Sequence, residues 1–142
     1  MTREWLRIGD IAREVGVSVD TIRHYERKGV LGSVERDPSG YRRYPAGTLQ
    51  RVKMIRRALA IGFSLAELAR ILRQRDGGTP PCRNVRALAG EKLADLDRRI
   101  AEMTAMRAEL AGIDEEWDER LAATREGEAA LLLERLPARA GE

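Results

Sequence analysis

The stretch RIGDIAREVGVSVDTIRHYERKG, residues 7–29, decides the fold. Its apolar residues recur at helical spacing before Gly16 and again after Ser18. Glycine suits the left-handed conformation that ends a helix, and serine suits the N-cap that starts the next one. Two short helices, over residues 8–15 and 18–28, are therefore predicted, with the tight turn of a helix-turn-helix between them.

The next stretch, VERDPSGYRRY at residues 34–44, contains the chemistry of a tight turn. In Asp37-Pro38-Ser39-Gly40, proline favours the second position of the turn and glycine the fourth. The segments on either side can pair, so we expect a small β-hairpin. A hairpin directly after a helix-turn-helix is a wing.

Two more helices and a break follow. Pro45 suits a first helical position and predicts a third helix from there to about residue 60. Ser64 and Glu67 match the capping box of a fourth helix that ends near residue 75. The glycines and prolines of residues 76–81 then interrupt the chain. We place the predicted winged helix-turn-helix domain at residues 1–76.

A long helix is expected after this break, from residue 84 to about 112, because Gly90 is the only strong interruption. Its apolar residues step by three, four and seven, which is coiled-coil spacing. At 1.5 Å per residue the helix is a rod of roughly 45 Å, which the head is too small to cover. A second copy of the chain is the simplest partner for this apolar stripe, and the alternative is that the rod folds back on its own head. The predicted dimerisation residues are Leu93, Leu96, Ile100, Met103 and Leu110.

The predicted fold is therefore mainly α, in three parts. The winged head is followed by a linker and long dimerisation helix at residues 77–113. A short C-terminal effector segment, residues 114–142, carries helical pieces near residues 117–121 and 129–136.

Charge is distributed unevenly along the chain. Residues 1–76 hold 16 Lys/Arg against 9 Asp/Glu, whereas residues 77–142 hold 10 against 14. A basic front indicates a polyanionic partner such as DNA, although arginine-rich helices can also be merely solvated.

Several functional classes lack support in the sequence. The longest apolar run, residues 129–133, is far too short to cross a membrane, and residues 1–5 do not resemble a secretion signal. Cys82 is the only cysteine, so no intrachain disulfide can form. No glycine-rich phosphate loop or nucleophile elbow is present. We therefore expect a cytoplasmic protein that is not an enzyme and has no membrane partner.

The order of these motifs resembles the MerR family of bacterial transcription regulators over essentially residues 7–110. The resemblance implies a homodimer with an antiparallel coiled coil, bound to a pseudo-palindromic promoter operator. It also implies that an unidentified signal makes the protein distort the DNA, so that RNA polymerase can use a promoter with too long a spacer. Such a protein acts as an activator or a repressor. The segments that carry the resemblance are RIGDIA (7–12), GVS (16–18), TIRHYERKG (21–29), GYRRY (40–44) and LAIGFSL (59–65).

The helix that begins at Ser18 is expected to enter the major groove of double-stranded DNA, with the wing on the phosphate backbone. By resemblance, Arg23, Tyr25, Tyr41 and Arg42 match family positions that contact DNA. Tyr25 has an alternative interpretation as a core residue, and His24 is favoured as a DNA-facing or surface residue over a metal ligand. The candidate DNA-binding residues are Ser18, Val19, Thr21, Arg23, His24, Tyr25, Arg27, Tyr41, Arg42 and Arg43.

Cys82 and Trp117 are the candidate effector residues. Cys82 lies where the N-terminus of the long helix favours a thiolate. In mercury-sensing members, which this region resembles, a cysteine at this position joins two others, but here Trp117 takes the place of the second and no thiol follows. Because soft-metal sites need several ligands, mercury-type sensing is not expected. Cys82 is interpreted as a structural residue, a reactive thiol or part of a metal site, and that metal ion is the only cofactor considered.

Trp117 has two interpretations. Its indole lines an apolar pocket for an organic effector, or it plugs the end of the dimer seam. Two other functions also fit the whole chain: an effector-free architectural DNA-binding protein, and a module that uses its helix-turn-helix against another protein.

Overall fold

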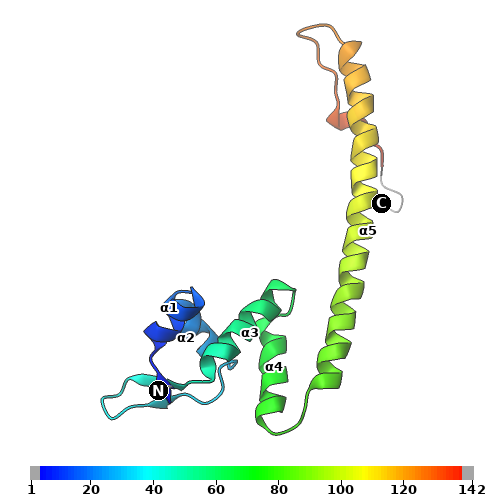
Figure 1. Ribbon diagram of the computed structural model, residues 1–142. Helices are drawn as coiled ribbons and strands as arrows, with labels where there is room; N and C mark the ends of the chain where they lie inside the picture. The colour runs from blue at the N-terminus through cyan, green and yellow to red at the C-terminus, as the bar shows by residue number, and fades with distance from the viewer. Residues whose placement is uncertain (1–3, 139–142) are drawn as a thin grey trace. The chain divides into compact units, whose positions relative to one another are not determined.

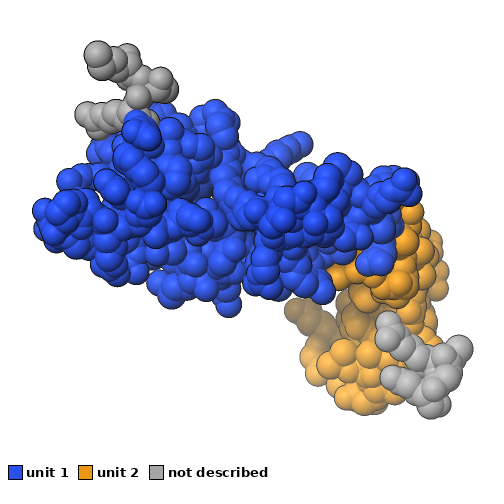
Figure 2. Space-filling model, turned by 90° about the horizontal axis from the view of Figure 1, so that it is seen from below, with its two compact units in different colours: residues 1–92 blue, residues 93–142 orange. Residues whose placement is uncertain are grey.

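The computed structural model describes residues 4–138. Within that range the fold is mainly α with a small sheet, as predicted, and the chain divides into two compact units, residues 1–92 and 93–142 (Figure 2). In chain order the elements are β1 (Trp5–Leu6), α1 (Ile8–Val15), α2 (Val19–Arg27), β2 (Glu35–Arg36), β3 (Arg42–Pro45), α3 (Thr48–Ala60), α4 (Leu65–Asp76), α5 (Cys82–Ala122) and the 3-10 turn η1 (Leu133–Arg135) (Figure 1).

Helices α1 and α2 form the predicted helix-turn-helix. Gly16 ends α1 with a φ of 76°, a left-handed conformation that glycine adopts without strain. The Ser18 hydroxyl accepts a hydrogen bond of 3.1 Å from the Thr21 N–H and so caps α2. Ile11 and Ile22 are fully buried, which joins the two helices to one core.

The sheet contains one strand that the sequence did not reveal. Strand β3 lies between β1 and β2 and is antiparallel to both. The predicted start of the third helix at Pro45 was wrong, because Pro45 pairs with Trp5 in the ladder between β1 and β3. Helix α3 begins only at Thr48. β1 has two residues, too few to give a periodic pattern.

The core of the first unit lies between the helices and strand β3. Its fully buried side chains are Ile11, Ile22, Val30, Tyr44, Val52 and Ile55. The predicted capping box of α4 is confirmed: Ser64 Oγ accepts from the Glu67 N–H at 3.1 Å, and Glu67 Oε1 accepts from the Ser64 N–H at 3.0 Å. Among the described residues, no helix combines the length and hydropathy needed to cross a bilayer.

Helix α5 is longer than predicted. It begins at Cys82 and continues past residue 112 to Ala122, so residues 117–121 are part of it rather than a separate helical piece. Gly112 does not end it, since one glycine costs a helix only about 1 kcal/mol. The helix expected near residues 129–136 is reduced to the short turn η1, Leu133–Arg135.

The compact units do not coincide with the predicted domains. The first unit extends to residue 92 instead of residue 76 because the first turns of α5 pack on α4. Lys92 Nζ lies 2.7 Å from Glu67 Oε1, and Asn84 donates a 2.8 Å hydrogen bond to Gln74. The break at residues 77–81 therefore bends the chain without ending the unit.

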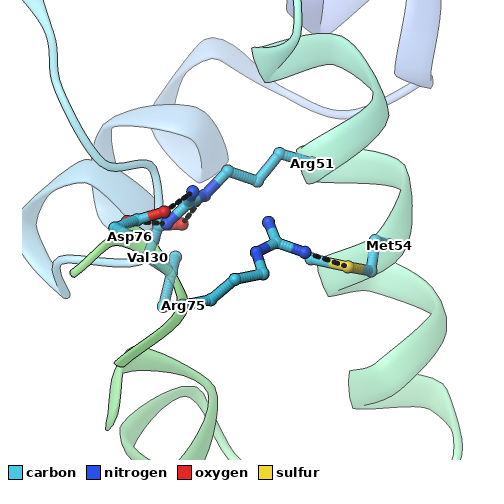
Figure 3. Close-up of polar contacts among 5 residues, drawn as sticks. All are labelled: Val30, Arg51, Met54, Arg75 and Asp76. Atoms are coloured by element: carbon cyan, nitrogen blue, oxygen red, sulfur yellow. Dashed lines mark hydrogen bonds and ion pairs between the residues drawn. The ribbon is translucent and has the colours of Figure 1, made fainter. Parts of the chain in front are cut away.

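A half-buried arginine, Arg51, ties the end of α4 to the rest of the head (Figure 3). Arg51 donates through Nη1 and Nη2 to the Asp76 carboxylate, both at 2.8 Å, and through Nε to the Val30 carbonyl at 2.7 Å. Arg75 reaches back to the Met54 sulfur at 3.7 Å. The hydrogen bonds from Arg51 lower the pKa of Asp76 below its usual value.

Replacing Asp76→Asn removes the charge that Arg51 faces. Because Asp76 is 41% exposed, we expect a modest loss, about 1 kcal/mol in the free energy of unfolding at neutral pH. A carboxyl whose folded pKa is depressed stabilises the fold above its unfolded pKa, and that stabilisation disappears as pH falls through the folded value. The difference from the native chain should therefore begin to shrink below roughly pH 4, the unfolded pKa of an aspartate, and vanish once pH lies below the lowered folded pKa.

Urea unfolding followed by circular dichroism across this pH range measures the effect. Glu14→Gln, an exposed carboxylate on α1, is the matched control and should change stability little. A difference between Asp76→Asn and the native chain that stays constant into acid would contradict the role assigned to this ion pair.

Candidate nucleic-acid interface

The exposed face of α2 and the wing frame two adjoining hollows lined mainly by cations. The larger hollow has a volume of about 270 Å³ and the smaller about 240 Å³. Arg23 from α2 and Arg42 from β3 line both, so the hollows form one basic surface. The other lining residues are Arg7, Ile8, Arg36, Gly40 and Tyr41 in the larger hollow, and Glu26 and Arg27 in the smaller.

The predicted DNA-binding residues on and just before α2 differ in how exposed their side chains are. Ser18 is exposed, but its hydroxyl already caps the helix and contacts Thr21 Oγ1 at 2.9 Å. Val19 is half-buried and packs against the core. Thr21 and His24 are half-buried. Arg23 and Arg27 are exposed, so these two arginines are the most accessible side chains of the set on α2.

Tyr25 does not reach this surface. Its side chain is 6% exposed and belongs to the core. It follows Ile22 by three positions, which places both residues on the inward face of α2. This burial supports the alternative interpretation of Tyr25 as a core residue over a contact with DNA.

The tip of the wing is held by Asp37. Its Oδ1 accepts hydrogen bonds from the Ser39 N–H at 2.9 Å and the Tyr41 N–H at 3.0 Å. Gly40 has a φ of 85°, which closes the turn that the sequence predicted. Tyr41 is 63% exposed at this tip, so its ring is available to a partner.

Two arginines of this surface were missed by the sequence analysis. The Arg7 guanidinium lies 5.5 Å from the centre of the Tyr41 ring and 3.5 Å from the Asp37 carboxylate. Arg36 donates to the Gly40 carbonyl at 2.9 Å. Arg7 precedes α1 by one residue, and only the folded chain brings it beside the wing.

Arg42 and Arg43 are neighbours in β3 but lie on opposite sides of the strand. Arg42 Nε donates to Glu26 Oε1 at 2.8 Å, which holds it beside α2. Arg43 donates to Glu35 at 3.0 Å, and its guanidinium lies 4.5 Å from the centre of the Trp5 ring. Arg43 was also predicted to bind DNA, but it lines neither hollow. The structure therefore does not bring it together with Arg23 and Arg42.

Tyr44 completes the contact between β3 and α2. It is fully buried, and its hydroxyl donates to Glu26 Oε2 at 3.1 Å. Burial, and then the neighbouring Glu26 carboxylate, raise the pKa of Tyr44 to about 12. The phenol therefore stays protonated as a hydrogen-bond donor at any physiological pH.

The second unit carries the predicted apolar stripe on α5. Every predicted dimerisation residue is exposed in the single chain, from 48% at Leu96 to 69% at Met103. Met106, which was not predicted, is also 55% exposed. A run of exposed apolar side chains along one helix is typical of a surface that another molecule covers.

The two candidate effector residues lie at different points of α5. Cys82 is its first residue and is exposed. Trp117 is half-buried on the last third of the helix, where the chain turns back after Ala122 (Figure 1). Among residues 4–138, no three His, Cys, Asp or Glu side chains gather closely enough to hold a metal ion.

Comparison with known proteins identifies the family. A family model described as MerR HTH family regulatory protein matches residues 6–75, and one described as MerR, DNA binding matches residues 49–113. The mercuric resistance operon regulatory protein of Pseudomonas fluorescens is 39% identical over 108 residues, which are 76% of this chain and 74% of the relative. The HTH-type transcriptional regulator ZntR of Escherichia coli is 34% identical over 77% of this chain and 78% of its own length.

Solved structures agree with this result. The transcription regulator PbrR691 from Ralstonia metallidurans CH34, in complex with lead(II), is 29% identical with a TM-score of 0.74, over 91% of this chain and 98% of that one. HiNmlR, a MerR family regulator lacking the sensor domain and bound to promoter DNA, is 23% identical with a TM-score of 0.55, over 83% and 94%, and shares the fold. The chain belongs to the MerR family of DNA-binding transcriptional regulators.

Proposed function

We propose that the basic surface formed by α2 and the wing binds double-stranded promoter DNA, with α2 in the major groove and the wing on the backbone. The observation that carries this proposal is that Arg23 and Arg42, from two separate elements, line both hollows. A guanidinium suits phosphate oxygens and guanine edges alike. Arg7, Arg27 and Arg36 add positive charge around them.

Replacing Arg23→Ala or Arg42→Ala should lower affinity for DNA about tenfold each, since each removes a charge-assisted hydrogen bond. If the lost contact is to phosphate, the slope of log affinity against log salt should also fall by about one. The probe is a duplex selected from a randomised pool by the full-length chain, and fluorescence anisotropy at several salt concentrations measures both quantities.

Arg73→Ala is the matched control, because Arg73 is exposed on α4 and lines neither hollow. It should leave affinity almost unchanged. An equal loss of affinity in Arg73→Ala and Arg42→Ala would mean that affinity for DNA depends only on the total charge of the chain. Unchanged affinity in both Arg23→Ala and Arg42→Ala would refute the assigned surface.

A second copy of the chain is the proposed partner of the stripe on α5. Leu93 to Leu110 extends over roughly 25 Å of helix, and its side chains recur at coiled-coil spacing. The same stripe on an antiparallel copy is self-complementary, as a two-fold interface requires. Such a pair would hold two heads at a set distance, which suits a pseudo-palindromic operator.

A charge inside the stripe should separate the copies. Ile100→Glu places a carboxylate where the proposed interface is apolar, and should convert a dimer to a monomer at micromolar concentration in analytical ultracentrifugation. Ala105→Glu adds the same charge about 180° around the helix from the stripe and should leave the dimer intact. A native chain that sediments as a folded monomer would overturn this part of the proposal.

The proposed regulator acts with RNA polymerase at a promoter, where a signal favours the conformation that distorts the DNA. Relatives are named for mercuric resistance or bound to lead(II), but the residues of this chain fit such a metal poorly. Cys82 is the only thiol in the sequence, and soft-metal sites combine several ligands. We therefore propose that the signal is not a thiophilic metal.

This proposal predicts the behaviour of Cys82→Ser. The variant should keep the affinity for the selected duplex, because Cys82 is exposed on α5 and lines neither hollow. Transcription in vitro with mercuric or lead(II) salt, in glutathione-containing buffer, should be the same for Cys82→Ser and the native chain. A metal-dependent rise in transcription that is lost in Cys82→Ser would contradict it.

A further inference from the structure

We propose that Glu26 is a positioning residue for DNA binding: it holds the wing arginine Arg42 against the recognition helix α2. This inference rests on the proposed function, since it assumes that Arg42 contacts DNA. It assigns a favourable role to a carboxylate inside a basic surface, where simple electrostatics predicts an unfavourable one.

Both carboxylate oxygens of Glu26 are engaged by strand β3. Oε1 accepts from Arg42 Nε at 2.8 Å, and Oε2 accepts from the Tyr44 hydroxyl at 3.1 Å. Tyr44 is fully buried and cannot move without disturbing the core. The Glu26 side chain, 21% exposed, is therefore anchored on one side and holds Arg42 on the other.

The bond to Glu26 leaves most of the Arg42 guanidinium available. It uses Nε alone, and within residues 4–138 Glu26 is the only protein partner of the Arg42 side chain. Nη1 and Nη2 remain for a phosphate, which a guanidinium binds through two parallel N–H groups. Because the side chain is already fixed, less conformational entropy is lost when it binds a phosphate.

Asp20 offers a matched comparison on the same helix. It also pairs with an arginine of the basic surface, Arg23, but at 3.5 Å and with 91% of its side chain exposed. A pair so exposed positions little. The two carboxylates should therefore act in opposite directions: loss of the Asp20 charge relieves repulsion of the phosphates, whereas loss of the Glu26 charge releases Arg42.

The experiment compares Glu26→Gln, Asp20→Asn, Arg42→Gln and the double variant Glu26→Gln/Arg42→Gln in the full-length chain. The probe is the duplex selected by binding, measured by anisotropy after circular dichroism has verified folding. We expect Glu26→Gln to lower affinity about fivefold, since a neutral amide holds a guanidinium less strongly than a carboxylate. Asp20→Asn should raise affinity, and Glu26→Gln should cause no further loss once Arg42 is absent.

Tyr44→Phe gives an independent test if Glu26→Gln proves unstable. It keeps the buried ring and removes only the hydroxyl that holds Glu26 Oε2, so affinity should fall in the same direction by a smaller factor. The melting temperature of each variant separates this loss from a loss of fold.

Three outcomes would overturn the inference. Unchanged or higher affinity in Glu26→Gln would mean that the carboxylate acts only through its charge. An equal loss in the Arg42→Gln background would mean that Glu26 does not act through Arg42. Unchanged affinity in Arg42→Gln would refute both the proposed DNA surface at the wing and the inference. A large loss of affinity in Arg42→Gln together with unchanged affinity in Glu26→Gln would refute the inference alone.

Discussion

One side of strand β3 carries Arg42 and Tyr44, and the hydrogen bonds of both to Glu26 join the wing to α2. Because side chains alternate along a strand, the burial of Tyr44 determines the side on which Arg42 lies. The same alternation sends Arg43 toward Trp5 on the other side. The basic surface depends on this anchor, since without it the wing would carry its arginines on a short unsupported hairpin.

The head and the long helix differ in how their apolar side chains are covered. The head has enough apolar residues to form its own core, and the Arg51–Asp76 pair fastens the last turn of α4 to it. The part of α5 beyond residue 92 has no such core, and its stripe of leucine, isoleucine and methionine stays exposed in a single chain. The proposed dimer on a two-fold operator would use both features: a head with its own core, and a helix whose exposed apolar stripe a second copy would cover.

Local signals predicted much of this fold correctly. Gly16, Ser18 and the Ser64–Glu67 capping box mark helix ends where the structure has them, because capping depends on neighbours within one turn. The turn at residues 37–40 is local for the same reason. Errors arose where a distant segment intervened. Pro45 is a favourable first residue of a helix, but its pairing with Trp5 keeps it in a strand.

The sequence by itself determined the winged helix-turn-helix and the apolar stripe, because periodicity and turn chemistry are carried by residues close together in the chain. The order of its motifs indicated the family by resemblance. Only the tertiary structure decided which cations share a surface. It brought Arg7 beside the wing, placed Tyr25 in the core, and turned Arg43 toward Trp5. These outcomes depend on contacts between segments far apart in sequence, and the direction of a side chain there is set by what the opposite segment buries.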